Sequence, residues 1–104
     1  MNLLSAPLSV GSVSIKNRVV VPAMADFGMT RSDGLVNERH ISRYGAYAKG
    51  GAGLIIVEAC SVARFQENRG TIVLDSDDCL PGMTKLAKAT SDNNAVALVQ
   101  IMLT

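Results

Sequence analysis

The sequence predicts an α/β fold built from alternating strands and helices, and two observations indicate it. Apolar runs of strand length recur at intervals of roughly 35 to 45 residues, with helical patterns between them. The joints between a helix and the next apolar run are short, as in the βα units of a parallel sheet. Units of this period occur in closed (β/α)8 barrels and in open doubly wound sheets.

The first predicted elements are short strands. Leu8–Val10 and Val13–Ile15 alternate in polarity around a central Gly-Ser pair, a pattern typical of a hairpin. The β-branched residues 19–21 form the first strand of the expected parallel sheet, and Pro22 ends it because proline has no N–H for the ladder. Residues 23–36 carry two glycines and several polar residues, which indicates a loop.

The first long helix is predicted to begin after Asn37, whose side chain can cap it. Glu38 lies in the first turn, where the helix dipole favours a negative charge, and Gly50 and Gly51 end the helix. Residues 54–57 then form a continuous apolar run, typical of a doubly buried strand. The expected inner face of the helix consists of Ile41, Tyr44, Ala48 and Tyr47.

The second crossover repeats this plan. Residues 60–76 are an expected loop with a short strand at 71–74, and Pro81 is placed as the first residue of a helix, where its missing N–H costs nothing. Residues 95–102 form a third apolar run, which predicts another buried strand. The expected inner face of the second helix consists of Met83, Leu86, Ala87 and Thr90.

The predicted elements are too few for a closed barrel. Parallel strands are normally covered by a helix and flanked by another strand, and the run at 95–102 has neither after it. A (β/α)8 barrel typically takes about 250 residues, whereas this chain has 104. We therefore interpret residues 1–104 as the N-terminal part of a larger (β/α)8 barrel domain. The competing interpretation is a genuine small three-stranded domain with an exposed last strand.

Composition excludes several classes of protein. Hydrophobic residues make up 48% of the chain and charged residues 18%, which is too apolar for a disordered protein. The net charge is +1 with no basic stripe, so nucleic acid is not the expected partner. No secretory signal or apolar run of membrane-spanning length is present, and we expect a cytoplasmic protein with no membrane partner. Cys60 and Cys79 are accordingly expected to be reduced thiols.

Functional groups in such folds collect at the C-terminal ends of the strands, which here are residues 22–26, 58–60 and 100–102. Gln100 is the notable member, because an amide in a buried strand must find partners or cost about 1–3 kcal/mol. It can read the donor–acceptor edge of a flat heterocycle, or it can bond to backbone and neighbouring side chains. The residues alone leave both roles open.

Other chemically capable residues are given structural roles. Glu58 is expected to make an ion pair or anchor a loop, and His40, between Arg39 and Arg43, is expected at a helix surface. The glycine-rich segment 49–53 follows a helix and precedes a strand, the reverse of a phosphate-binding loop, so it is predicted to be a turn. The sequence predicts no metal site and no catalytic residue within this segment.

Several blocks of the sequence resemble the Old Yellow Enzyme family of NADH:flavin oxidoreductases, including its branch with 2-enoate and 2,4-dienoyl-CoA reductases. The resemblance covers nearly the whole chain. Its blocks are Leu-Ser-Val-Gly at 8–11, Ile-Lys-Asn-Arg-Val-Val at 15–20, Pro-Ala-Met at 22–24, Asp-Gly at 33–34, Tyr-Gly-Ala-Tyr-Ala-Lys-Gly-Gly at 44–51 and Gly-Leu-Ile-Ile-Val-Glu-Ala at 53–59.

The resemblance implies a (β/α)8 barrel that binds FMN at the C-terminal ends of its strands, with the hairpin closing the other end. The parent protein would pass hydride from NAD(P)H through FMN to an activated alkene or a similar small molecule. The resemblance also implies cofactor-binding roles: Gln100 would hydrogen-bond the pyrimidine edge of the flavin, Ala59 would place its backbone N–H near the ring, and the ring would be lined by Pro22, Ala23, Met24 and Ala25.

Two positions depart from the family pattern. The family often has Cys or Thr where Ala25 stands, and usually has His where Leu103 stands. Because the substrate-binding, proton-donating and phosphate-binding parts are expected beyond Thr104, the isolated chain is expected to be inactive. One alternative is a non-catalytic βα fragment stabilised by self-association into a homo-oligomer. Another is a different flavin barrel, such as a dihydrouridine synthase.

Overall fold

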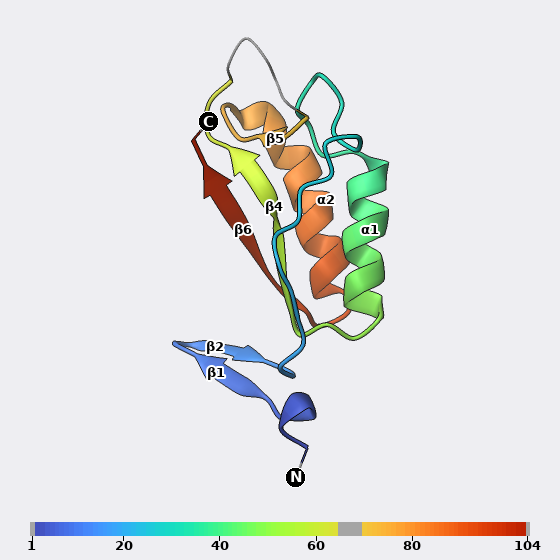
Figure 1. Ribbon diagram of the computed structural model, residues 1–104, viewed down its shortest axis with the longest axis vertical. Helices are drawn as coiled ribbons and strands as arrows, with labels where there is room; N and C mark the ends of the chain where they lie inside the picture. Colours follow the sequence, from blue (N-terminus) through green and yellow to red (C-terminus); the bar gives the residue numbers. More distant parts are fainter. Residues whose placement is uncertain (1, 65–69, 104) are drawn as a thin grey trace.

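The computed structural model describes residues 2–64 and 70–103, and it shows a sheet covered on one face by two helices, with a hairpin projecting beyond one end (Figure 1). Its extents of 51 × 24 × 22 Å reflect that projection. The elements in chain order are η1 (Leu3–Ser5), β1 (Leu8–Val10), β2 (Val13–Ile15), β3 (Val20–Val21), α1 (Glu38–Lys49), β4 (Leu54–Ser61), β5 (Ile72–Val73), η2 (Asp77–Cys79), α2 (Leu80–Ser91) and β6 (Val96–Met102).

The four-stranded sheet is parallel throughout, and β4 is its centre. β6 pairs with one edge of β4, while β3 and β5 pair with it at Leu54–Ile55 and Cys60–Ser61 respectively. α1 connects β3 to β4, and α2 connects β4 to β6, which gives two successive βαβ crossovers. The α/β class and the order of elements expected from the sequence are confirmed.

The core lies between the sheet and the helices. Along β4, Ile55, Val57 and Cys60 are at most 2% exposed and pack beneath α1 and α2. The helices pack on each other where Gly45 of α1 approaches Ala89 of α2. The buried apolar cluster consists of Tyr44, Ala48, Ala52, Ile55, Val57, Cys60, Ile72, Leu86 and Ala95.

The β1–β2 hairpin is tied to the N-terminal ends of the strands by the segment that follows it. The Asn17 side-chain amide donates to the Gly51 carbonyl (2.7 Å), just before β4, and the Lys16 ammonium donates to the Asn93 carbonyl (2.8 Å), just before β6. Gly53 packs directly on Asn17, leaving no room for a side chain. The Lys-Asn-Arg block therefore fixes the hairpin at the bottom of the sheet.

Two expectations about burial are wrong. The sequence predicts a buried β6, but Leu98 is 52% and Ile101 64% exposed, because in the described part of the chain β6 pairs along one edge and one of its faces is uncovered. Ala87, expected on the inner face of α2, is exposed, and Ala89 meets α1 instead. Residues 65–69 of the expected loop lie outside the described residues.

Candidate functional site at the C-terminal ends of the strands

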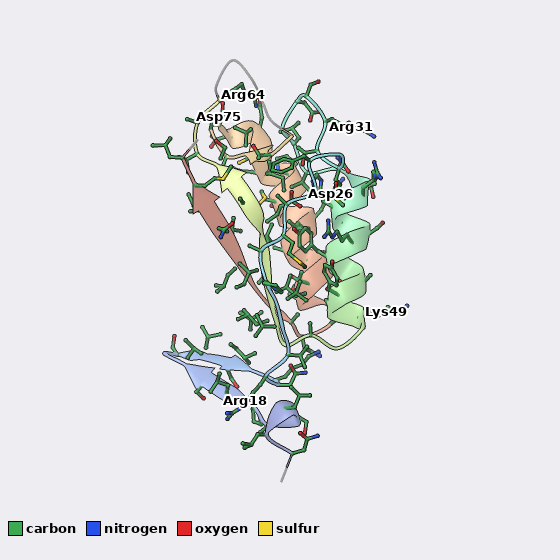
Figure 2. The ribbon with its side chains drawn as sticks, viewed as in Figure 1. Arg18, Asp26, Arg31, Lys49, Arg64 and Asp75 are labelled. Atoms are coloured by element: carbon green, nitrogen blue, oxygen red, sulfur yellow. The ribbon has the colours of Figure 1, made fainter. Side chains whose placement is uncertain are left out.

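The parallel register gathers three strand ends at one edge of the sheet. Val21 pairs with Ile55, and Val57 pairs with Val99, so the segments after these residues lie at the same level. Residues 22–26, 58–60 and 100–102 are therefore brought together, as predicted. Figure 2 shows Arg64 and Asp75 beyond the arrowhead of β4, and Asp26 lower, beside the N-terminal end of α1.

All six residues predicted to contact a cofactor are accessible at this edge. Ala23 and Ala59 are half-buried; the exposed members are Pro22, Met24, Ala25 and Gln100. The expectation that Gln100 is buried in its strand is wrong, since β6 is uncovered. Within residues 2–64 and 70–103 its side-chain amide has no hydrogen-bond partner. An amide without a partner in the described residues can bind the edge of a flat heterocycle, and small side chains beside it can lie against the face of the ring.

β4 contains a bulge at this level. Its Val57 pairs with Val99 and its Cys60 with Ile101, so Glu58 and Ala59 together lie opposite the single residue Gln100. The extra residue interrupts the alternation of side chains along the strand. Val57, Glu58 and Cys60 are all buried on the helix side, and the half-buried Ala59 is left for the open face of the sheet.

The bulged residue Glu58 is bound by Tyr44 of α1. The Tyr44 hydroxyl accepts from the Glu58 backbone N–H (2.9 Å) and donates to its carboxyl Oε1 (2.9 Å). Glu58 is 0% exposed. Its Oε2 has no hydrogen-bond partner within 3.5 Å in the described structure, although the Asp26 backbone lies near enough to favour the ionised carboxyl. It makes no ion pair there, so of the two roles expected for it, anchoring is the one the contacts support.

Burial raises the pKa values of both Glu58 and Tyr44. It raises the pKa of the Glu58 carboxyl above its ordinary value, opposed by the Tyr44 hydroxyl and the Arg43 guanidinium. It also raises the pKa of Tyr44, so the phenol keeps the proton that it donates. Burial raises the pKa of the Cys60 thiol to about 12, with Glu58 adding to the effect, so this thiol is unreactive.

A second set of contacts joins the segment after β3 to α1. The Arg43 guanidinium lies 3.8 Å from the Asp26 carboxylate, and its Nε donates to the Tyr47 hydroxyl at 3.1 Å. The Asp26 carboxylate also accepts from the Gly28 N–H at 3.0 Å, which shapes the turn. Residues 22–26 are thus held against the same helix that holds Glu58.

His40 is buried, which corrects the surface role expected for it. Its Nδ1 accepts from the Asn37 backbone N–H (3.0 Å), while the Asn37 side chain caps the same turn, forming a capping box. Its Nε2 lies 3.0 Å from the Thr30 hydroxyl. Burial lowers the pKa of His40, and Arg43 and Arg39 lower it further, so the ring is neutral. The signal for this burial in the sequence is the spacing of Asn37 and His40, which allows the capping box.

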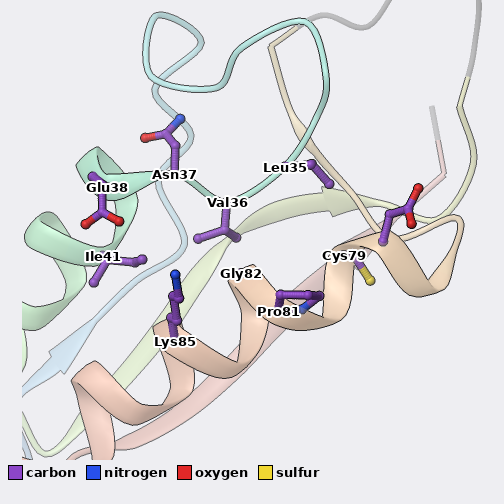
Figure 3. A pocket seen from close by; sticks show the side chains of 10 residues that line it. Leu35, Val36, Asn37, Glu38, Ile41, Cys79, Pro81, Gly82 and Lys85 are labelled. Carbon is purple, nitrogen blue, oxygen red and sulfur yellow. The ribbon is translucent and has the colours of Figure 1, made fainter.

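A separate cleft of about 280 Å³ lies on the helix side, between the N-terminal ends of α1 and α2 (Figure 3). Glu38, Asp78 and Lys85 give it mixed charge, and none of the six predicted cofactor residues lines it. Within the described ranges, no cluster of three or more His, Cys, Asp or Glu side chains could hold a metal ion. None of the described helices is long and apolar enough to cross a membrane.

Comparison with known proteins identifies the family. The family model described as NADH:flavin oxidoreductase / NADH oxidase matches residues 3–104. The chain belongs to this family. A metal reductase of Desulforamulus reducens is 34% identical to it over 101 residues, which is 97% of this chain and 15% of that protein.

Solved structures agree. A 2-naphthoyl-CoA reductase superposes with a TM-score of 0.89 at 29% identity, over 96% of this chain and 15% of that one. The Old Yellow Enzyme of Pichia sp. AKU4542 superposes with a TM-score of 0.86 at 25% identity, over 95% of this chain and 26% of that one. The expected resemblance to Old Yellow Enzymes is confirmed, and the fold is the N-terminal part of a (β/α)8 barrel. The chain spans about a seventh of the curated relative's length.

Proposed function

We propose that residues 1–104 form one wall of an FMN site in a flavin oxidoreductase whose barrel domain includes further chain. The observation that carries this proposal is the gathering of six accessible residues at the C-terminal edge of the sheet. They include the Gln100 side-chain amide, which has no hydrogen-bond partner within the described residues. Ligands of barrel enzymes bind at this edge. Membership of the NADH:flavin oxidoreductase family supports a flavin as the ligand.

The proposed roles follow from the chemistry of each residue. The Gln100 amide both donates and accepts, so it can read the pyrimidine edge of the flavin. Ala59 has a side chain small enough for its backbone N–H to approach the ring. The segment from Pro22 to Ala25 offers small or flexible apolar side chains against the ring face. FMN, when bound, supplies the hydride chemistry.

NAD(P)H is the proposed electron donor, and a small molecule with an activated double bond, or a similar acceptor, is the proposed substrate. The matched relatives include a metal reductase and a 2-naphthoyl-CoA reductase, so acceptors differ within the family. We propose that the residues for substrate binding, protonation and phosphate binding lie in the further part of the barrel. The isolated chain should therefore bind FMN weakly and be inactive.

A titration of the 104-residue chain with FMN, followed by two-dimensional ¹⁵N NMR, tests this proposal. We expect shifts at the backbone amides of residues 23–25, 59 and 100, with weak affinity. The amides of Leu54 and Val96, at the opposite end of the same strands, serve as internal controls and should not move. Shifts spread evenly over the chain would contradict the proposed site. Sub-micromolar affinity would contradict the claim that the phosphate is held by other parts of the barrel.

A second candidate is a non-catalytic fragment that self-associates through its strand edges. The exposure of Leu98 and Ile101 on β6 favours it, since exposed apolar strand edges promote pairing between copies. Sedimentation showing a compact, stable monomer would count against it.

A third candidate, a dihydrouridine synthase, would need to bind tRNA, and the net charge of +1 gives that function no support.

A further inference from the structure

We propose that Tyr44 and Glu58 are positioning residues that select which side chain of the β4 bulge faces the cofactor edge. This inference rests on the proposed function. The hydroxyl of Tyr44 holds both the backbone N–H and the carboxyl of Glu58 in the helix layer, which leaves Ala59 to face the open side of the sheet.

The bulge determines whether Glu58 or Ala59 faces the open side of the sheet. Side chains of a strand alternate between faces, so after Val57, which packs under the helices, an unbulged strand would send Glu58 to the open face and Ala59 to the core. A shift of one residue exchanges the two faces. The inserted residue at this point places Val57 and Glu58 on the same side and turns Ala59 outward.

The Tyr44 hydroxyl supplies the hydrogen-bond acceptor for the Glu58 backbone N–H at the bulge. A bulge leaves one residue of the strand without its ladder partner, and a buried unpaired N–H is costly. The Glu58 N–H finds its acceptor at 2.9 Å in the Tyr44 hydroxyl, and the same hydroxyl donates to Glu58 Oε1. Tyr44 is itself 2% exposed, so no solvent competes for these bonds.

The alternative placement of Glu58 would be harmful to the proposed site. On the open face its carboxyl would be solvated, ionised and next to Ala59 and Gln100, where the flavin edge is proposed to lie. A carboxylate there would repel the negative charge that a flavin gains on reduction. Holding Glu58 under α1 keeps that charge away and presents a small residue whose backbone a flat ring can approach.

The test uses ¹⁵N NMR of the 104-residue chain with and without FMN. In the Tyr44→Phe variant, we expect the Glu58 and Ala59 amide signals to shift, and the Glu58 amide to exchange with solvent faster by about tenfold or more. We expect FMN-induced shifts at Ala59 to be lost while those at Gln100 remain. Tyr47→Phe is the matched control, because Tyr47 lies on the same helix and its hydroxyl bonds to Arg43. It should leave both amides unchanged.

A second pair of variants covers the case in which Tyr44→Phe does not fold. Glu58→Gln keeps a carbonyl that can accept from the Tyr44 hydroxyl and should preserve the signals of Ala59. Glu58→Leu removes that acceptor and should displace them. Unchanged Glu58 and Ala59 amides in Tyr44→Phe, or an unchanged Ala59 amide in Glu58→Leu, would overturn the inference. An absence of FMN shifts in the wild type would instead refute the proposed function, while the ligand-free signals still decide the role of Tyr44.

Discussion

The two ends of the sheet are built differently. At the N-terminal ends of the strands, side chains and backbone are engaged: Asn17 bonds to the turn before β4, Lys16 to the turn before β6, and Gly53 admits no side chain. At the C-terminal ends, Met24 and Gln100 are exposed, and the Gln100 amide has no side-chain partner in the described structure. We infer that the edge at the N-terminal ends of the strands, the lower edge, serves stability, and we propose that the edge at their C-terminal ends, the upper edge, serves binding.

The largest effect on stability is expected at the lower edge, from Gly53→Ala. The new Cβ would lie 2.9 Å from the Asn17 carbonyl oxygen and 3.0 Å from Ile15 Cγ2, so backbone must move. We expect a loss of about 2–3 kcal/mol in the free energy of unfolding, measured by urea titration. Gly45→Ala is the control, because its Cβ would meet Ala89 at an ordinary 3.7 Å and alanine favours the helix. Equal losses in both variants would refute the comparison.

Glu58→Gln, beneath the upper edge, is expected to change the free energy of unfolding by an intermediate amount that depends on pH. Burial raises the pKa of Glu58 in the folded state above its unfolded value, so folding favours the protonated carboxyl. The wild type therefore loses stability as the pH rises from the unfolded pKa through the folded one, at a rate of up to about 1.4 kcal/mol per pH unit. The glutamine has no proton to lose.

The measurement is urea unfolding of both proteins between pH 4 and pH 8. The stability of Glu58→Gln relative to wild type should increase with pH, because the other titrating groups are shared and cancel. A difference that stays constant across this range would show that Glu58 does not have the raised pKa that its burial implies. A difference that falls with pH would mean that the ionised carboxylate is the favoured form in the folded chain.

These contrasts also explain what the sequence could and could not predict. The helix from Glu38 to Lys49 was recognisable, because its cap, its terminal glycines and its apolar spacing are all local signals. The gathering of residues 22–26, 58–60 and 100–102 at the upper edge was recognisable, because neighbouring parallel strands run in the same direction and end at the same edge of the sheet. The burial of His40 was not, since an Asn-x-x-His capping box is a rarer form of a pattern usually ending in Glu or Gln.

The bulge at Glu58 was hidden for a different reason. The run Leu-Ile-Ile-Val-Glu-Ala-Cys reads as a plain strand, and only the pairing of Val57 with Val99 and of Cys60 with Ile101 reveals the inserted residue. The tyrosine that stabilises it lies 14 positions earlier on another element. The exposure of β6 also depends on its neighbours in space, which its own apolar residues do not specify.

The smallest effect on stability, and the sharpest on binding, is expected from Gln100→Leu. Its side chain is exposed and has no hydrogen-bond partner among the described residues, so the free energy of unfolding should change by no more than about 0.5 kcal/mol. The FMN-induced shift at residue 100 should nevertheless disappear, because leucine cannot read the donor–acceptor edge of a heterocycle. If binding survived and stability fell instead, Gln100 would belong with the residues that support the fold. The upper edge would then be no freer than the lower one.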